Sequence, residues 1–341
     1  MNYPESPQIL EKIKASSNIL VNMHHNPDAD SVGSAVAMAR VLKHLEKNVR
    51  ILSSTEVPSN LHFVLGQERA DVVDFHKIDF SGYDLFITLD SSSWSRVSGT
   101  NDLDQPNIPF IVIDHHATNT RFGEINLVIA DVAANCEVLF YLFQDWGIEP
   151  DIAEMKDYPD IHNPLLTGII GDTGAFRFPE ADIGTFEIAR KLMNLADKNK
   201  IIFNLYQSYE KSHLEVWKEL MANMSIDSGN RFVYSFVPFE TLKKQGKPFN
   251  AKSELADIIF QNIEDTDFGF VGAEDEGYVS VSFRSRTGVD VAKLAQELGG
   301  GGHKWASAAR VYLPYDKAIE KILDTCKNYV QKIKASNTQR N

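Results

Sequence analysis

Residues 18–34 of the chain read NILVNMHHNPDADSVGS. The largely apolar run Asn18–His24 predicts a buried strand, and Pro27 ends it because the residue before a proline is held extended. Apolar residues at helical spacing then predict a helix over Ser31–Lys47. A strand, a turn and a helix in this order are the unit from which α/β domains are built.

The same alternation continues through the first half of the chain. Further apolar runs predict strands at Val49–Ser53, Asp84–Asp90 and Pro109–Asp114. Helices are expected at Ala134–Trp146, His162–Gly171 and Asp182–Asn194. Continuous apolar strands suit a mainly parallel sheet that is covered on both faces. The sequence therefore predicts a doubly wound α/β domain over residues 1–195.

The pattern changes in the second half, after a linker that is expected over residues 196–212 and includes a helical piece. Strands are predicted at Arg231–Val237, Phe268–Gly272 and Tyr278–Phe283. Helices are predicted at Ser253–Ile263, Val289–Leu298 and Asp316–Ile333. These elements indicate a smaller mixed α/β domain over residues 213–341.

The composition of the 341-residue chain, 43% hydrophobic and 24% charged, is typical of a soluble globular protein. The N-terminus lacks the apolar segment of a secretory signal, and no run approaches the roughly 20 apolar residues that span a bilayer. Cys136 and Cys326 match no zinc spacing, so we expect reduced thiols and a cytoplasmic protein without a membrane partner. A net charge of −13 argues against a long nucleic-acid track but not against a small anionic substrate.

Three side chains with the chemistry of metal ligands, His24, Asp28 and Asp30, follow the first strand. Asp28 and Asp30 stand two residues apart, so in extended backbone they project to one side. Asp30 or Ser31 can also cap the helix that follows. A cap explains one carboxylate only, whereas crowded carboxylates and imidazoles require a cation.

The same chemistry recurs further along the chain. Asp90 ends the strand DLFITLD, His115 and His116 follow Asp114 at the end of PFIVID, and Asp172 lies in GIIGDTGAFRF. Asp90 alone could cap a turn, and a plain turn would explain G-D-T-G equally well. Together these residues predict a metal site at the carboxyl edge of the sheet. Oxygen-rich ligands with imidazole and without thiolate favour Mn²⁺, with Mg²⁺ as the alternative.

These motifs, in this order, resemble those of the DHH phosphoesterase family. In the second half, Gly299–His303 (GGGGH), with Arg284 upstream in VSFRSR, resembles the substrate-binding motif of the DHH-associated C-terminal domain. The resemblance covers essentially the whole chain. The architecture and length are most similar to the branch of bifunctional oligoribonucleases and pAp phosphatases, because the larger exonucleases of the family carry extra domains for which this chain has no room.

The resemblance implies a two-metal centre in which Asp90 bridges two Mn²⁺ ions. One ion would be bound by His24, Asp28 and Asp90, and the other by Asp30, Asp90, His115 and Asp172. Asp114 and His116 would be the catalytic pair: Asp114 would orient a histidine, and His116 would face the scissile phosphate. A water activated by the ions would attack phosphorus in line with the leaving oxygen.

The resemblance also implies a substrate-binding set in the second domain, at the far side of an active-site cleft between the two domains. The set comprises Arg284, Gly300, Gly301, Gly302 and His303. Taken without the resemblance, the glycine run could be a flexible loop and Arg284 a solvated strand residue. One stretch departs from the family: residues 134–137 read Ala-Asn-Cys-Glu where relatives often carry a Ser/Thr-rich stretch. We expect this departure to affect substrate positioning and not the metal centre.

The leading hypothesis is a Mn²⁺-dependent phosphoesterase that hydrolyses short oligoribonucleotides to mononucleotides, and pAp to AMP. Two alternatives share the same centre: a phosphodiesterase of cyclic or linear dinucleotides and, less favoured, a pyrophosphatase or exopolyphosphatase. An inactive nucleotide-binding module ranks last, because every expected metal-ligand position is filled. The sequence is compatible with either direction of exonucleolytic attack and with either metal. It is also compatible with more than one oligomeric state, including a homodimer.

Overall fold

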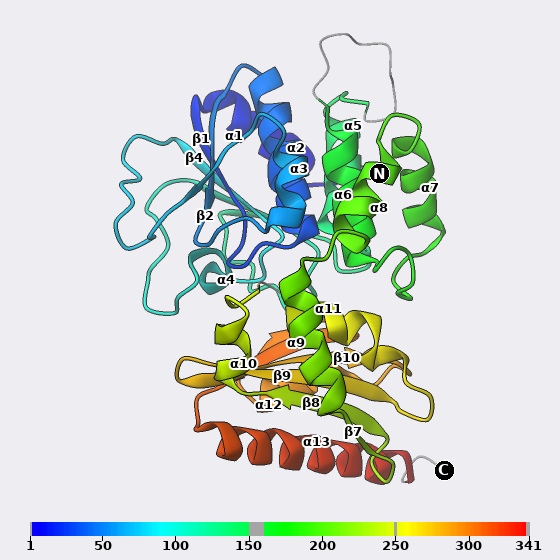
Figure 1. Cartoon of the computed structure of the whole chain (residues 1–341). Helices are drawn as coiled ribbons and strands as arrows, with labels where there is room; N and C mark the ends of the chain where they lie inside the picture. The colour runs from blue at the N-terminus through cyan, green and yellow to red at the C-terminus, as the bar shows by residue number, and fades with distance from the viewer. Residues whose placement is uncertain (1, 150–159, 249–250, 339–341) are drawn as a thin grey trace. The chain divides into compact units, whose positions relative to one another are not determined.

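The computed structural model describes residues 2–149, 160–248 and 251–338. The chain forms two compact units, Met1–Ser208 and Tyr209–Asn341, which we call the N-terminal and C-terminal units (Figure 1). Among the described residues, no helix combines the length and the apolar composition needed to cross a membrane.

A six-stranded, fully parallel sheet forms the centre of the N-terminal unit, in the spatial order β3-β2-β1-β4-β5-β6. Its strands are β1 (Asn18–Asn22), β2 (Asn48–Ser53), β3 (Ala70–Val72), β4 (Leu85–Leu89), β5 (Phe110–Asp114) and β6 (Ile125–Val128). The direction of winding reverses between β1 and β4. Open α/β sheets bind their ligands outside the carboxyl ends of the strands at such a switch point.

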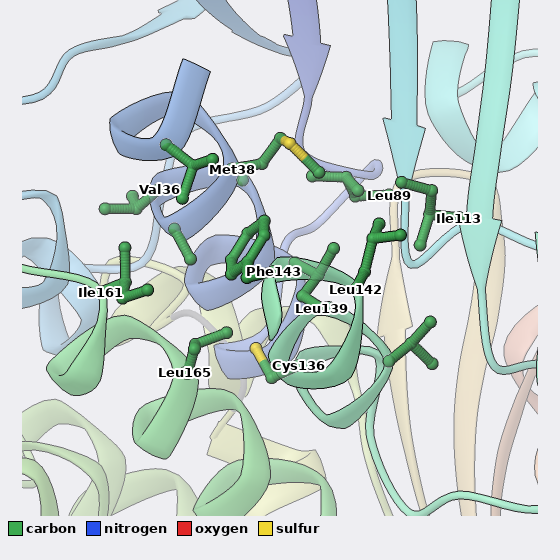
Figure 2. Close-up of a cluster of buried hydrophobic side chains, with 14 of the residues drawn as sticks. Val36, Met38, Leu89, Ile113, Cys136, Leu139, Leu142, Phe143, Ile161 and Leu165 are labelled. Carbon is green, nitrogen blue, oxygen red and sulfur yellow. The ribbon is translucent and has the colours of Figure 1, made fainter. Parts of the chain in front are cut away.

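Most helices of this unit cover one face of the sheet. The helices are α1 (Ser6–Ala15), α2 (Ala29–His44), η1 (Ser59–Leu61), α3 (His62–Leu65), α4 (Trp94–Ser98), α5 (Asn135–Asp145), α6 (His162–Asp172), α7 (Ile183–Leu192) and α8 (Lys198–Tyr206). Figure 2 shows Leu139 and Phe143 of α5 in the buried cluster that also contains Met38 of α2. Leu89 and Ile113, at the ends of β4 and β5, belong to the same cluster, so the carboxyl edge rests on a packed core.

The opposite face of the sheet is covered by one short helix and by loops. Phe86 of β4 and Phe110 of β5 form a smaller core there with Trp94 of α4 and with Phe75. The rings of Phe86 and Trp94 meet edge to face at 6.1 Å. The predicted parallel α/β architecture is confirmed, with a thick helical layer on one face and a thin aromatic layer on the other.

The agreement with the sequence prediction is best for the buried elements. The four predicted strands of this unit lie within two residues of β1, β2, β4 and β5. The short outer strands β3 and β6 were not predicted, because ADV and INLV are too short and too mixed in polarity to stand out. The segment predicted as a linker holds α8 and the start of α9.

The C-terminal unit is built on a mixed six-stranded sheet in the order β11-β12-β10-β9-β8-β7, in which only β8 and β9 pair in parallel. The strands are β7 (Ser225–Asp227), β8 (Phe232–Val237), β9 (Phe268–Asp275), β10 (Tyr278–Ser285), β11 (Gly301–Gly302) and β12 (Ala306–Val311). The helices are α9 (Lys211–Ala222), α10 (Phe239–Lys244), α11 (Ala251–Ile258), η2 (Phe260–Asn262), α12 (Val291–Glu297) and α13 (Tyr315–Thr338). The predicted smaller mixed domain is confirmed.

The two faces of this second sheet are covered differently. Helices α12 and α13 pack on one face and enclose an aromatic core, and Figure 1 shows α13, in red, running along the sheet. On the other face, α9 and α11 cover β8 and β9. They leave Ala308 and Arg310 of β12, and Tyr312 just after it, exposed to solvent. The C-terminal unit therefore keeps part of one sheet face open.

Candidate metal centre

The residues after β1 combine a helix cap with possible metal ligands. Asp28 is the N-cap of α2: its Oδ1 accepts hydrogen bonds from the backbone N–H groups of Asp30 at 3.1 Å and Ser31 at 3.0 Å. The expectation that Asp30 or Ser31 would be the cap was wrong, because the helix begins two residues earlier than predicted, at Ala29. The capping bonds occupy one oxygen of Asp28 and leave Oδ2 at 3.3 Å from Nε2 of His24.

His24 is buried and oriented by the backbone. Its Nδ1 lies 3.0 Å from the carbonyl oxygen of His25, which fits a donated N–H and leaves the lone pair on Nε2. That Nε2 lies 3.5 Å from Oδ2 of Asp90. His24, Asp28 and Asp90 thus offer three ligand atoms within 4.8 Å of one another.

Asp90 stands at the centre of the arrangement, directly after β4. Its backbone is left-handed, with φ of 50°, a conformation that costs a non-glycine residue about 1–3 kcal/mol and that gathers at functional sites. Within the described chain, the buried Oδ1 of Asp90 accepts no hydrogen bond, although Nε2 of His115 lies 3.4 Å away. The two oxygens of Asp90 therefore face two different groups, Oδ2 toward His24 and Oδ1 toward His115.

The second group consists of Asp30, His115 and Asp172, whose ligand atoms also lie within 4.8 Å of one another. Nε2 of His115 lies 3.3 Å from Oδ2 of Asp172 and 3.8 Å from Oδ2 of Asp30. Asp172 comes from the last residue of α6, and His115 follows β5 directly. The order of the sheet thus brings four separate segments of the chain to one site.

Residues 134–137, the stretch that departs from the family pattern, bear directly on this group. Asn135 and Cys136 begin α5, and their backbone N–H groups donate to the two oxygens of Asp30, at 2.6 and 3.0 Å. Backbone groups make these bonds, so they do not depend on a Ser or Thr side chain at either position. The stretch holds a candidate metal ligand in place.

The electrostatics of the site favour bound cations. Burial and then the charge of Asp30 raise the pKa of Asp90 well above its usual range. Burial and then the charge of Asp172 raise the pKa of Asp30 to about 7. Divalent ions would neutralise this repulsion and would use the Asp90 oxygen that accepts no hydrogen bond. An oxygen-rich donor set with two imidazoles fits Mn²⁺ or Mg²⁺.

Asp114 orients His116. The fully buried Asp114 accepts from Nδ1 of His116 at 2.8 Å through Oδ1, and from Nδ2 of Asn119 at 2.6 Å through Oδ2. Burial acts to raise the pKa of Asp114, but the bond from His116 and the nearby imidazoles lower it to about 2. His116 is thereby fixed through one ring nitrogen.

Two residues at this edge were missed by the sequence analysis. Asn119 holds Asp114, and Arg96 of α4 places Nη2 3.3 Å from Nε2 of His24. Both lie in segments that follow a motif aspartate by five or six residues, Asp114 and Asp90 respectively. Nothing but this position after a strand end marks them in the sequence, because neither belongs to a periodic pattern.

In the C-terminal unit, Arg284 and the glycine run have structural partners of their own. Arg284 forms a two-pronged ion pair with Asp257, with Nη2 3.1 Å from Oδ2. A side chain at Gly300 would place Cβ 2.1 Å from the carbonyl oxygen of Ala308, whereas Gly301 has open space around it. The run forms the short strand β11 against β12, so close backbone packing requires glycine at 300 but not at 301.

The sequence matches agree with this geometry. Residues 18–169 match the DHH family, N-terminal domain, and residues 229–332 match the DHHA1 domain. The chain therefore contains an N-terminal domain of the DHH family followed by a DHHA1 domain. The resemblance expected from the motifs is confirmed.

Named relatives refine the class. The bifunctional oligoribonuclease and PAP phosphatase NrnA of Thermus thermophilus is 29% identical over 337 residues, 95% of either chain. NrnA of Bacillus subtilis is 25% identical over 325 residues, which are 93% of this chain and 96% of that protein.

Solved structures show the same fold. An exopolyphosphatase-related protein from Bacteroides fragilis superposes with a TM-score of 0.84 at 21% identity, covering 97% of each chain. RecJ of Thermus thermophilus in complex with Mn²⁺ superposes with a TM-score of 0.53 at 15% identity, covering 96% of this chain and 54% of RecJ. At these identities, the likeness concerns the fold alone.

Proposed function

We propose that the protein is a Mn²⁺-dependent phosphoesterase that hydrolyses short oligoribonucleotides to mononucleotides and pAp to AMP. The observation that carries this proposal is the pair of ligand groups on either side of Asp90, at the switch point of the sheet. The substrate class rests on the similarity to NrnA proteins along nearly the whole chain.

Two ions would be held by the groups described above. His24 and Asp28 would hold one, His115 and Asp172 with Asp30 the other, and Asp90 would contact both. Bound ions supply Lewis acidity, which lowers the pKa of a water nucleophile and neutralises charge on the phosphate. Mg²⁺ satisfies the same oxygen ligands, and the imidazoles favour Mn²⁺.

The protein side chains would position the reacting groups. Asp114 and Asn119 fix the ring of His116, which would then contact a phosphate oxygen or the leaving oxygen. Arg96, beside His24, adds a positive charge next to the first ligand group. In the C-terminal unit, we propose that Arg284, Gly300, Gly301, Gly302 and His303 bind substrate phosphate.

Two further features belong to this proposal. Both cysteines are free and buried, which agrees with a reducing cytoplasmic location. Without a long basic track, an acidic chain is expected to prefer short substrates. A homodimer is the proposed assembly, to be checked by light scattering.

A product time course with Mn²⁺ tests the function. The substrates are 5′-labelled RNA of two to about 24 nucleotides, pAp, cyclic di-AMP and pyrophosphate, each with an EDTA control. We expect mononucleotides from the shortest RNAs, AMP from pAp, and no turnover with EDTA. A preference for pyrophosphate, or for the longest RNA, would overturn the proposal.

A further inference from the structure

Two positive charges of the C-terminal unit have no carboxylate partner among the residues that the structure describes. Lys252, on α11, donates from Nζ to Oγ of Ser282 at 2.9 Å. Arg310, on β12, lies over the ring of Tyr278, with its guanidinium carbon 5.4 Å from the ring centroid. Among the described residues, neither cation forms an ion pair, in contrast to Arg284, which is held by Asp257.

These cations lie close enough together to repel one another. Burial, followed by the charges of Arg284 and Arg310, lowers the pKa of Lys252 to about 8. Asp257 compensates only the charge of Arg284. A bound anion would relieve the remaining repulsion between Lys252 and Arg310.

The strand register places aromatic rings next to these charges. Tyr278, Ser280 and Ser282 alternate along β10 and share one face, and Ser280 lies directly opposite Arg310. Tyr312 follows two residues after Arg310, and its ring centroid lies 5.5 Å from that of Tyr278. We define the basic–aromatic strip as Lys252, Tyr278, Ser280, Arg310 and Tyr312.

The strip is open to solvent at its aromatic end. Tyr312 is 70% exposed, and Arg310 is exposed as well. A hollow of about 310 Å³ adjoins it, lined by Glu274, Gly277, Tyr278, Tyr312, Leu313 and Pro314. This volume is at the lower limit for small-molecule sites, and walls of tyrosine suit a flat aromatic ring.

We propose that the basic–aromatic strip binds a nucleotide of the substrate strand that lies beyond the bond being cleaved. Its phosphate would lie at Lys252 and Arg310, and its base would stack on Tyr312 beside Tyr278. Cations interleaved with aromatic rings bind single-stranded nucleic acid in this way, with little regard to sequence. The choice of ligand rests on the proposed function, whereas the site itself rests on the geometry of the C-terminal unit.

The dimensions of the strip favour an oligonucleotide over a single nucleotide. From Arg284 to Tyr278, the seven residues of β10 span six steps, or about 20 Å, which exceeds the length of one nucleotide. A substrate phosphate held near Arg284 and a base on Tyr312 therefore require a chain of several nucleotides. Dinucleotides and pAp would not reach the aromatic end.

Binding to the full-length, metal-free protein tests the site without relying on turnover. Fluorescein-labelled pentaadenylate and diadenylate RNA are titrated in EDTA at several salt concentrations, and anisotropy gives the dissociation constants. We expect Arg310→Met to weaken pentaadenylate binding about tenfold and to reduce the salt slope by about 0.7, as for one phosphate contact on a single strand. Diadenylate binding should change by less than about twofold, because a dinucleotide ends before the strip.

Matched variants separate the contributions. Tyr312→Ala should weaken pentaadenylate binding about tenfold, within the range for loss of one stacked base, while Tyr312→Phe retains the affinity. Lys317→Met removes an exposed cation from α13, on the covered side of the sheet, and should change the affinity for neither RNA. Because positions 310 and 312 are exposed, the substitutions there should leave the midpoint of thermal unfolding unchanged.

Three results would overturn the inference. The first is that both Arg310→Met and Tyr312→Ala bind pentaadenylate with wild-type affinity. The second is that these variants lose equal affinity for diadenylate and pentaadenylate. The third is that the protein binds a penta-aspartate peptide as tightly as RNA, and through Arg310. The proposed function is judged separately. If the wild-type protein binds pentaadenylate through Arg310 but hydrolyses no phosphoester with Mn²⁺, the proposed function is contradicted, whereas the inferred binding site is supported.

Discussion

The carboxyl edge of the first sheet and the open face of the second concentrate charges of opposite sign. In the N-terminal unit, burial and the charge of Asp172 raise the pKa of Asp30 to about 7. In the C-terminal unit, burial and the charges of Arg284 and Arg310 lower the pKa of Lys252 to about 8. In both places burial and like charge disfavour the ionised form, and a ligand of the opposite charge would favour it. The comparison predicts cations at the first site and phosphate at the second.

The largest expected effect comes from the residue that links the two ligand groups. Asp90→Asn should reduce Mn²⁺-dependent turnover by about a thousandfold or more, because both ions lose a shared charged ligand. A folding defect is not the expected cause. Since burial raises the pKa of Asp90, the carboxylate destabilises the metal-free fold increasingly as pH rises above about 4, where the unfolded group ionises.

Thermal unfolding of the metal-free variant provides the control. At pH 7.5, Asp90→Asn should unfold at a temperature equal to or above that of the wild type in EDTA. Asp79→Asn, which alters an exposed turn-capping carboxylate of the same unit, should keep full activity. Wild-type activity in the Asp90→Asn protein would remove the bridging role.

A smaller loss is expected from the support of His116. Asp114→Asn should reduce kcat about 10- to 100-fold, as for residues that orient a working side chain, with the affinity for Mn²⁺ retained. Atoms of Asp90, Asp114 and His116 also lie within 4.8 Å of one another, so Asp114 has a second possible role as a metal ligand. Calorimetric titration with Mn²⁺ distinguishes the two: a parallel loss of metal affinity would make Asp114 a ligand.

The glycine run separates packing from substrate contact. Gly300→Ala should lower the free energy of unfolding by about 1–3 kcal/mol, because the added Cβ meets the Ala308 carbonyl. Gly301→Ala has open space and should leave stability unchanged. If Gly301 contacts substrate, the same variant should raise KM for diadenylate several-fold. Unchanged KM and stability would leave this glycine without a role.

The smallest expected effect is a change with pH at Lys252. Because burial and nearby cations lower its pKa to about 8, Lys252 loses its charge as pH rises through 8, well before an ordinary lysine does. Pentaadenylate binding to the metal-free protein should therefore weaken a few-fold between pH 7 and 9, as one phosphate contact is lost. Lys252→Arg keeps the charge and should give a flatter profile. Identical profiles for the two proteins would contradict this assignment.

The comparison also shows what a sequence can reveal about a site. Asp90 and Asp114 were predicted because each ends a continuous apolar strand, and parallel strands bring their carboxyl ends to one edge. The basic–aromatic strip was not predicted. Lys252 lies on a helix, and Arg310 meets Tyr278 only through the antiparallel register of β10 and β12. Register depends on tertiary pairing, which leaves no local mark in the sequence.

The number of Mn²⁺ ions that the protein binds tests the central claim most directly. Electron paramagnetic resonance of free Mn²⁺, recorded while the full-length, metal-free protein is titrated, gives the stoichiometry. The two ligand groups around Asp90 predict two ions per chain, with the Asp90→Asn protein losing tight binding of at least one. A single ion in the wild type, or two ions bound equally tightly after Asp90→Asn, would contradict a centre that is shared through Asp90.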